Sequence, residues 1–150
     1  MTTNEPRIAM MPLRVRYLEA DQQGVVFNMW YLAYFEDARN HYLETVGYPL
    51  TDLLASGHDI QVVATELAWS GPVRWGQDDV KIRTHVSKVG GSSLTFDFEV
   101  VRGDRLLVTG RTVYVIVALN GSGKQPVPDA LRRAMAPRPA TPHEEERHDG

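Results

Sequence analysis

The longest regular pattern in the chain is a helical one in its first third. Between Asn28 and Val46, apolar residues recur at steps of three and four: Tyr31, Phe35, Ala38, Tyr42 and Val46. Residues at such steps lie on one face of an α-helix. Asn28 is a suitable N-cap, and Gly47 with Pro49 ends the helix. Because the first two turns, MWYLAYF, are apolar on all sides, we expect the helix to be enclosed by the rest of the fold.

Patterns typical of β-strands lie before and after this helix in the sequence. Leu13, Val15 and Tyr17 alternate with two arginines, which predicts a short strand before it. After the helix, strands are predicted over 61–69, 80–89, 94–100 and 106–119, with a helical turn at 51–55 and a last short helix at 128–135. The pattern therefore predicts an α+β fold, in which a curved antiparallel sheet of about five strands wraps around one long central helix.

The two ends of the chain lack such patterns. Residues 1–11 mix polar residues with scattered apolar ones, and we expect them to be flexible. Residues 136–150, APRPATPHEEERHDG, contain three prolines and no branched aliphatic or aromatic residue. Such a segment buries too little apolar surface to offset its ordering entropy. We therefore expect one folded domain over 12–135, followed by a disordered tail over 136–150.

Composition excludes several functions. The chain of 150 residues has 16 Lys and Arg against 19 Asp and Glu, so it offers no basic surface for nucleic acid. It has no cysteine, which excludes disulfides, thiolate nucleophiles and cysteine metal sites. The histidines have no spaced partners, so no metal site is expected. No apolar run is long enough to span a membrane or to act as a signal peptide, which predicts a cytoplasmic protein.

The candidate chemistry lies in the loop before the helix. Asp21 precedes Gly24 by three residues, and the predicted helix start follows at Asn28. A helix N-terminus offers unpaired N–H groups and the positive end of a dipole. These can polarise a carbonyl and stabilise an oxyanion while a carboxylate attacks it or activates water. Acids near helix starts are common for capping reasons, so the spacing alone favours an acid that only stabilises the helix start.

Residues 21–39, DQQGVVFNMWYLAYFEDAR, resemble the signature of the 4-hydroxybenzoyl-CoA thioesterase family of hotdog-fold proteins. The resemblance extends over about residues 12–119 in the order of the predicted elements. It implies a sheet wrapped around the helix and a homodimer whose sheets join edge to edge, and a homotetramer is the expected larger assembly. It also implies an active site at the subunit interface and hydrolysis of acyl-CoA thioesters without a metal or an organic cofactor.

The resemblance also implies roles for single residues. Asp21 matches the catalytic aspartate, as nucleophile or general base, and Gly24 matches the glycine of the tight turn. Asn28 matches the position whose backbone N–H polarises the thioester carbonyl, although relatives often carry His or Tyr there. Phe27 and Tyr31 are candidate substrate contacts.

Two further groups complete the predicted site. Glu36, about two turns into the helix, is a second candidate for the catalytic acid, because a helix carboxylate does the chemistry in a sister hotdog lineage. The alternative is that Glu36 pairs with Arg39, three residues on. Lys88, Ser92 and Ser93 lie around a glycine turn, where an ammonium group and backbone N–H groups can bind the phosphates of CoA.

The sequence thus favours a cytoplasmic acyl-CoA thioesterase and leaves the acyl chain open. One alternative is a thioesterase for acyl-carrier-protein conjugates in lipid or polyketide synthesis. Another is a non-catalytic acyl-CoA-binding protein, because one fold can serve several functions.

Overall fold

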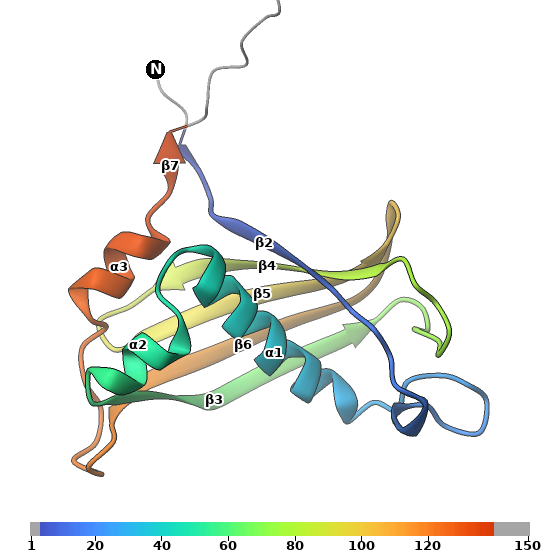
Figure 1. Ribbon diagram of the computed structural model, residues 1–150, viewed down its shortest axis with the longest axis horizontal. Coiled ribbons are helices and arrows are strands. Elements are labelled where there is room, and N and C mark those ends of the chain that lie inside the picture. The colour runs from blue at the N-terminus through green and yellow to red at the C-terminus, as the bar shows by residue number, and fades with distance from the viewer. Residues whose placement is uncertain (1–3, 140–150) are drawn as a thin grey trace, which may run out of the picture.

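A five-stranded antiparallel sheet curves around one long helix in the computed structural model (Figure 1). The structure describes residues 4–139. The strand order is β2-β4-β5-β6-β3. The strands are β2 (Ile8–Pro12), β3 (His58–Trp69), β4 (Val80–Val89), β5 (Ser93–Arg102) and β6 (Arg105–Ala118). The predicted α+β architecture, with about five antiparallel strands around a central helix, is confirmed.

The central helix is α1 (Trp30–Thr45), and it ends where Gly47 adopts a φ of +86°. Its buried face carries the predicted series, including Tyr31, Phe35 and Tyr42. This face meets the alternating apolar residues of β5, and Phe35 stacks on Phe98 with ring centroids 4.6 Å apart. The core therefore lies between α1 and the concave face of the sheet.

Shorter elements close the ends of this core. The helix α2 (Leu50–Ala55) buries Leu53 beside β3, and α3 (Asp129–Met135) buries Leu131. A short 3-10 helix, η1 (Tyr17–Glu19), precedes the loop that leads into α1. None of the described helices is both long and apolar enough to cross a membrane.

The strand predicted around Leu13–Tyr17 is wrong. The strand is β2, at Ile8–Pro12, and it pairs with β4. Leu13 and Val15 are buried as the alternation predicted, but they lie beyond the end of β2. The Leu13 N–H still donates to the carbonyl of Val80 (2.9 Å), the residue at which β4 begins. The pattern missed β2 because this edge strand exposes apolar side chains, Ile8 and Met10, so it shows no alternation.

The predicted ends of the folded domain also differ from the structure. Residues 4–11, predicted to be flexible, contribute β1 (Asn4–Glu5) and most of β2. In the predicted tail, β7 (Arg138–Pro139) pairs with β1. The remainder of the tail, 140–150, lies outside the described residues.

The prediction that the first turns of α1 are enclosed is wrong for the single chain. Met29, just before the helix, has 63% of its surface exposed, and Leu32 is also exposed. The sheet covers only the opposite face of the helix. This exposed apolar surface is therefore free to meet another molecule.

Gly110 on β6 provides a test of how α1 packs on the sheet. A Cβ built on Gly110 would overlap the ring of Phe35, whose Cζ would lie 2.9 Å away. Because this ring is buried and stacked, we expect Gly110→Ala to lower the free energy of unfolding by about 1–3 kcal/mol. Urea denaturation measures the change. Gly91→Ala is the control, since an added Cβ there meets nothing within 4 Å; equal effects in both variants would contradict the prediction.

Candidate active site

The loop between η1 and α1 folds into a small hairpin of residues 19–27, here called the Asp21 hairpin. The Phe27 N–H donates to the Glu19 carbonyl (3.0 Å), and the Asp21 N–H donates to the Val25 carbonyl (2.8 Å). At the tip, Gly24 has a φ of +74°, which glycine adopts without steric cost. The Trp75 N–H donates to the Gly24 carbonyl (2.9 Å), so the β3–β4 connection supports the tip.

The carboxylate of Asp21 is held on one side only. Its Oδ1 accepts the N–H groups of Gln23 (2.9 Å) and Val25 (3.1 Å). Its Oδ2 accepts no hydrogen bond from any residue that the structure describes. The side chain is exposed and lines a hollow of about 340 Å³, together with Tyr17, Leu18, Ala20, Gln22, Gly24 and Trp75. Asp21 therefore lies at a hollow that Tyr17 and Trp75 also line, with one carboxylate oxygen fixed and the other bonded to none of the described residues.

The start of α1 follows this hairpin directly. The prediction of Asn28 as N-cap is wrong, because the helix begins at Trp30 and Met29 occupies the cap position without a capping side chain. The Trp30 N–H donates to the Phe27 carbonyl (3.0 Å), and the Tyr31 N–H donates to the Asn28 carbonyl (3.4 Å). Within residues 4–139, the Asn28 N–H donates to no atom. This N–H is thus available to an oxygen from outside the chain.

Glu19, at the base of the hairpin, is a residue that the sequence analysis missed. It is 4% exposed and the only acid among the buried residues that the structure describes. Burial raises the pKa of its carboxyl, but hydrogen bonds from Arg16 and Tyr34 outweigh burial and hold the pKa below its usual value. The alternation in the sequence gave no signal of this burial, because Tyr17, which is in phase with Leu13, Val15 and Glu19, is 76% exposed.

The two predicted apolar substrate contacts differ in exposure. Phe27 is exposed beside the helix start. Tyr31 is 1% exposed and packs in the core. The centroid of its ring lies 5.8 Å from that of Tyr34 and 6.0 Å from that of Trp69. Of the two, only Phe27 presents its side chain at the surface of the single chain.

Glu36 lies in a different hollow from Asp21. It forms an ion pair with Arg39 and accepts a hydrogen bond from the Tyr114 hydroxyl (3.3 Å), in the first half of α1. Burial, followed by the charge of Glu36, raises the pKa of this tyrosine. The hollow, of about 340 Å³, is mostly apolar and is lined by Leu32, Ala33, Phe35, Glu36, Val62, Thr65, Thr112 and Tyr114. Its floor is the inner face of β3 and β6.

The structure does not bring Lys88, Ser92 and Ser93 to Asp21. They lie around the β4–β5 hairpin, at the end of the molecule opposite the Asp21 hairpin (Figure 1). The 16 residues of α1 separate the two ends, which corresponds to about 24 Å. Lys88 shares a hollow with Arg7 and Arg132, two cations that the sequence analysis missed because they come from distant segments.

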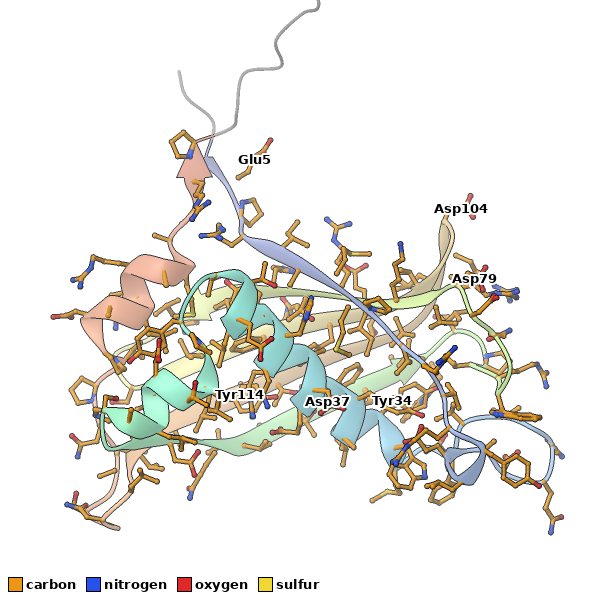
Figure 2. All side chains as sticks on the ribbon, viewed as in Figure 1. Glu5, Tyr34, Asp37, Asp79, Asp104 and Tyr114 are labelled. Carbon is orange, nitrogen blue, oxygen red and sulfur yellow. The ribbon has the colours of Figure 1, made fainter. Side chains whose placement is uncertain are left out.

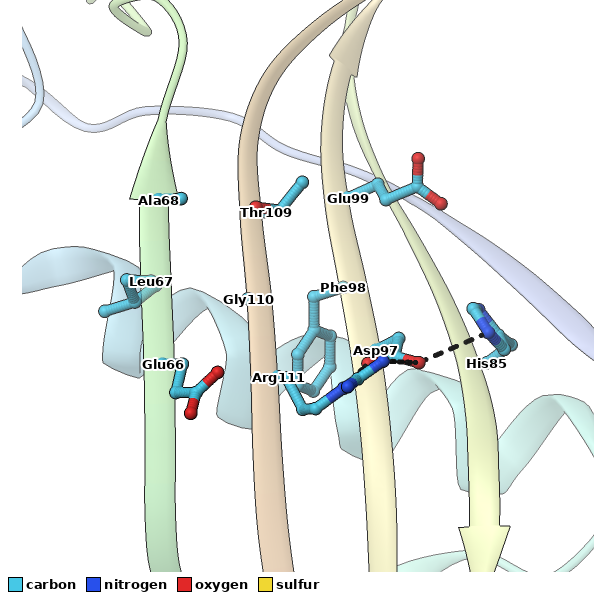
Figure 3. A pocket seen from close by; sticks show the side chains of 10 residues that line it. All are labelled: Glu66, Leu67, Ala68, His85, Asp97, Phe98, Glu99, Thr109, Gly110 and Arg111. Atoms are coloured by element: carbon cyan, nitrogen blue, oxygen red, sulfur yellow. Dashed lines mark hydrogen bonds and ion pairs between the residues drawn. The ribbon is translucent and has the colours of Figure 1, made fainter.

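A hollow of about 450 Å³ lies on the outer face of the sheet, away from all the predicted site residues (Figure 3). Its polar residues form a row across the strands. Asp97 accepts a hydrogen bond from Arg111 Nε (2.7 Å) and lies 3.5 Å from His85 Nε2. Burial raises the pKa of Asp97, but the hydrogen bond and charge of Arg111 dominate and hold it below its usual value.

The ion pair of Asp97 and Arg111 predicts that the stability of the fold depends on pH. Because the pKa of Asp97 is lower in the folded than in the unfolded state, its contribution is present above about pH 4 and is lost as the pH falls through the folded pKa. We expect Asp97→Asn to cost up to about 1 kcal/mol of unfolding free energy at pH 6, and less at pH 3. Urea denaturation across this range measures the difference. The exposed Asp78→Asn is the control, and a pH-independent difference for Asp97→Asn would contradict the prediction.

A curved antiparallel sheet wrapped around one long central helix is the hotdog fold. The sequence profile described as the thioesterase-like superfamily matches residues 15–135. The chain therefore belongs to this superfamily and is a thioester hydrolase.

Individual relatives are similar to this chain in sequence or in fold. The acyl-CoA thioesterase YbgC of Haemophilus influenzae is 36% identical over 105 residues, which cover 69% of this chain and 76% of that protein. The crystal structure of the hypothetical protein TT1821 of Thermus thermophilus matches with a TM-score of 0.78 and 31% identity, covering 85% of this chain and 95% of that one. A probable thioesterase of Bartonella henselae matches with a TM-score of 0.72 and 26% identity, covering 81% and 99%.

Proposed function

We propose that the chain is an acyl-CoA thioesterase of the 4-hydroxybenzoyl-CoA thioesterase family, with its catalytic centre at the Asp21 hairpin. One observation carries the assignment: a carboxylate with one fixed oxygen lies in the hairpin that leads to Asn28, and no described residue bonds to its other oxygen or accepts the Asn28 N–H. The named activity of the Haemophilus influenzae relative supports the substrate class.

The chemistry follows from these two groups. The Asn28 N–H and the dipole of α1 polarise the thioester carbonyl and stabilise the oxyanion that forms on it. The free Oδ2 of Asp21 then acts in one of two ways. As a nucleophile it forms a mixed anhydride, expels the CoA thiolate, and is regenerated by water. As a general base it takes a proton from the water that attacks the thioester. Both routes yield a free acid and CoA and need no metal or organic cofactor.

A second copy of the chain is part of this proposal. The edge strand β3 has 12 residues, pairs only with β6 among the strands of residues 4–139, and exposes Val62 and Val63. Further exposed apolar residues, including Met29 and Leu32, lie at the start of α1. Long apolar edges of this kind are prone to pair with another strand. We propose a homodimer in which the two β3 strands pair edge to edge, with a homotetramer as its larger assembly.

This dimer also explains the position of the phosphate-binding candidates. Antiparallel pairing of two β3 strands places the two α1 helices in opposite directions. Each Asp21 hairpin then faces the end of the second copy that carries Lys88, Ser92 and Ser93. A substrate as long as CoA would extend from the carboxylate of one copy to the basic end of the other, where Arg7 and Arg132 add to the positive charge.

The test is thiol release from a panel of aromatic, short aliphatic and long aliphatic acyl-CoA thioesters, with matching acyl-carrier-protein conjugates in parallel. We expect at least one acyl-CoA to reach a kcat/KM of about 10⁴ M⁻¹ s⁻¹. Carrier-protein conjugates should be at least about tenfold poorer substrates. A preference for the conjugates would instead favour the carrier-protein thioesterase. Tight binding of acyl-CoA without turnover would favour the non-catalytic binder.

A further inference from the structure

We propose that Glu19 is a positioning residue for Asp21, so that its buried carboxylate holds the Asp21 hairpin in a fixed place against α1. This inference rests on the proposed function, because it assigns Glu19 a role through the catalytic carboxylate. It concerns a residue that neither contacts the substrate hollow nor belongs to the predicted site.

The carboxylate of Glu19 joins three segments of the chain. Its Oε1 accepts the backbone N–H of Arg16 (2.8 Å) and the hydroxyl of Tyr34 (3.0 Å). Its Oε2 accepts Nε (3.1 Å) and Nη2 (3.0 Å) of the same arginine. Tyr34 belongs to the second turn of α1, at the end of the helix that faces the hairpin (Figure 2). One side chain thus links the chain before η1, the hairpin and the central helix.

The backbone of Glu19 is the base of the same hairpin. The carbonyl of Glu19 accepts the N–H of Phe27 (3.0 Å). The next residue, Ala20, forms an antiparallel β-bridge with Val26. Asp21 is the next residue along, two positions from the buried carboxylate. Movement of Glu19 would therefore shift both ends of the hairpin. The exposed side chain of Asp21 accepts hydrogen bonds only from N–H groups of its own hairpin within residues 4–139.

The cost of burying the ionised carboxylate of Glu19 suggests that this residue serves a function other than stability. A buried carboxylate is costly, and apolar residues of similar shape often stabilise a protein as well or better. Hydrogen bonds occupy both oxygens of Glu19 and hold its pKa below the usual value, so it is ionised at neutral pH. It therefore has no free oxygen for a substrate and acts through position. Displacement of a reacting group by about 1 Å can reduce a rate by about 100-fold.

The test compares Glu19→Gln with the wild type. Gln keeps the shape and one acceptor oxygen, but its NH₂ group would face the Arg16 guanidinium, which also donates. We expect kcat for the best acyl-CoA to fall by at least about tenfold, with KM within about twofold, because binding groups are untouched. Tyr34→Phe should give a smaller loss, and the double variant should be no worse than Glu19→Gln alone.

Hydrogen exchange followed by NMR gives a readout that does not need turnover. The amides of Asp21 and Phe27 should exchange at least about tenfold faster in Glu19→Gln, while the amide of Phe96 in β5 should not change. Asp97→Asn is the matched control, since it removes the charge of another acid paired with an arginine, on the far face of the sheet. It should leave kcat and both hairpin amides unchanged.

The outcomes separate this inference from the proposed function. A kcat of Glu19→Gln within twofold of the wild type, or unchanged exchange of the Asp21 and Phe27 amides, overturns the positioning role. A wild type that hydrolyses no thioester contradicts the proposed function, and the exchange rates then still decide whether Glu19 fixes the hairpin.

Discussion

Replacing Asp21 with Asn is expected to lower kcat for acyl-CoA hydrolysis by about 10²- to 10⁴-fold. The hydrogen bonds make this an unusually clean substitution. The amide oxygen of Asn can still accept the N–H groups of Gln23 and Val25, as Oδ1 does now, so the hairpin keeps its shape. The free Oδ2 becomes an NH₂ group, which neither attacks a thioester nor accepts a proton from water. The assay is thiol release under saturating substrate.

One control variant and one variant of the second candidate acid accompany this experiment. Asp37→Asn changes an exposed acid on α1 in the same way and should leave kcat within about twofold. Glu36→Gln tests the second candidate acid, which is already paired with Arg39 and Tyr114. Full activity in Asp21→Asn would refute the assignment of Asp21, and a large loss in Glu36→Gln alone would transfer the chemistry to the helix carboxylate.

Sequence periodicity predicted the elements that bury one face. The spacing of Tyr31, Phe35 and Tyr42 gave α1 to within two residues, because only a helix places these side chains together on one core. Strand β4 was predicted at its observed bounds, 80–89. The edge strand β2 was missed because its exposed side chains are apolar, so the difference between its two faces carries no signal.

The candidate site was predictable only where it is local in sequence. Asp21, Gly24 and the start of α1 lie within ten residues, and the structure forms them into one hairpin and helix entry. The role of Glu19 depends on Tyr34, which is 15 residues away, and no local pattern reveals such a contact. The separation of Lys88 from Asp21 likewise depends on the length and direction of α1, which place the two at opposite ends of the fold.

The proposed dimer predicts a second large effect, for Val63→Asp on β3. Val63 is 57% exposed and lies in a β-bulge, so it has no partner on β6, and its substitution leaves the ladder with β6 intact. An aspartate on each of two pairing edges would place like charges in the apolar interface, where desolvation makes them costly. We expect a monomer of 16.9 kDa by light scattering, with kcat/KM lowered at least about 100-fold because each site would lack its second copy.

The matched control for the dimer is Leu106→Asp, an exposed apolar residue at the start of β6, where the strand pairs with Val101 of β5 and its register with β3 has ended. It should change neither the mass in solution nor the activity. Circular dichroism must first show that Val63→Asp is folded, which its exposed position favours. A folded Val63→Asp monomer with wild-type kcat/KM would show that one chain holds a complete site. A dimer that persists in this variant would exclude β3 as the pairing edge. Only loss of the dimer together with loss of activity supports a site at which two copies meet.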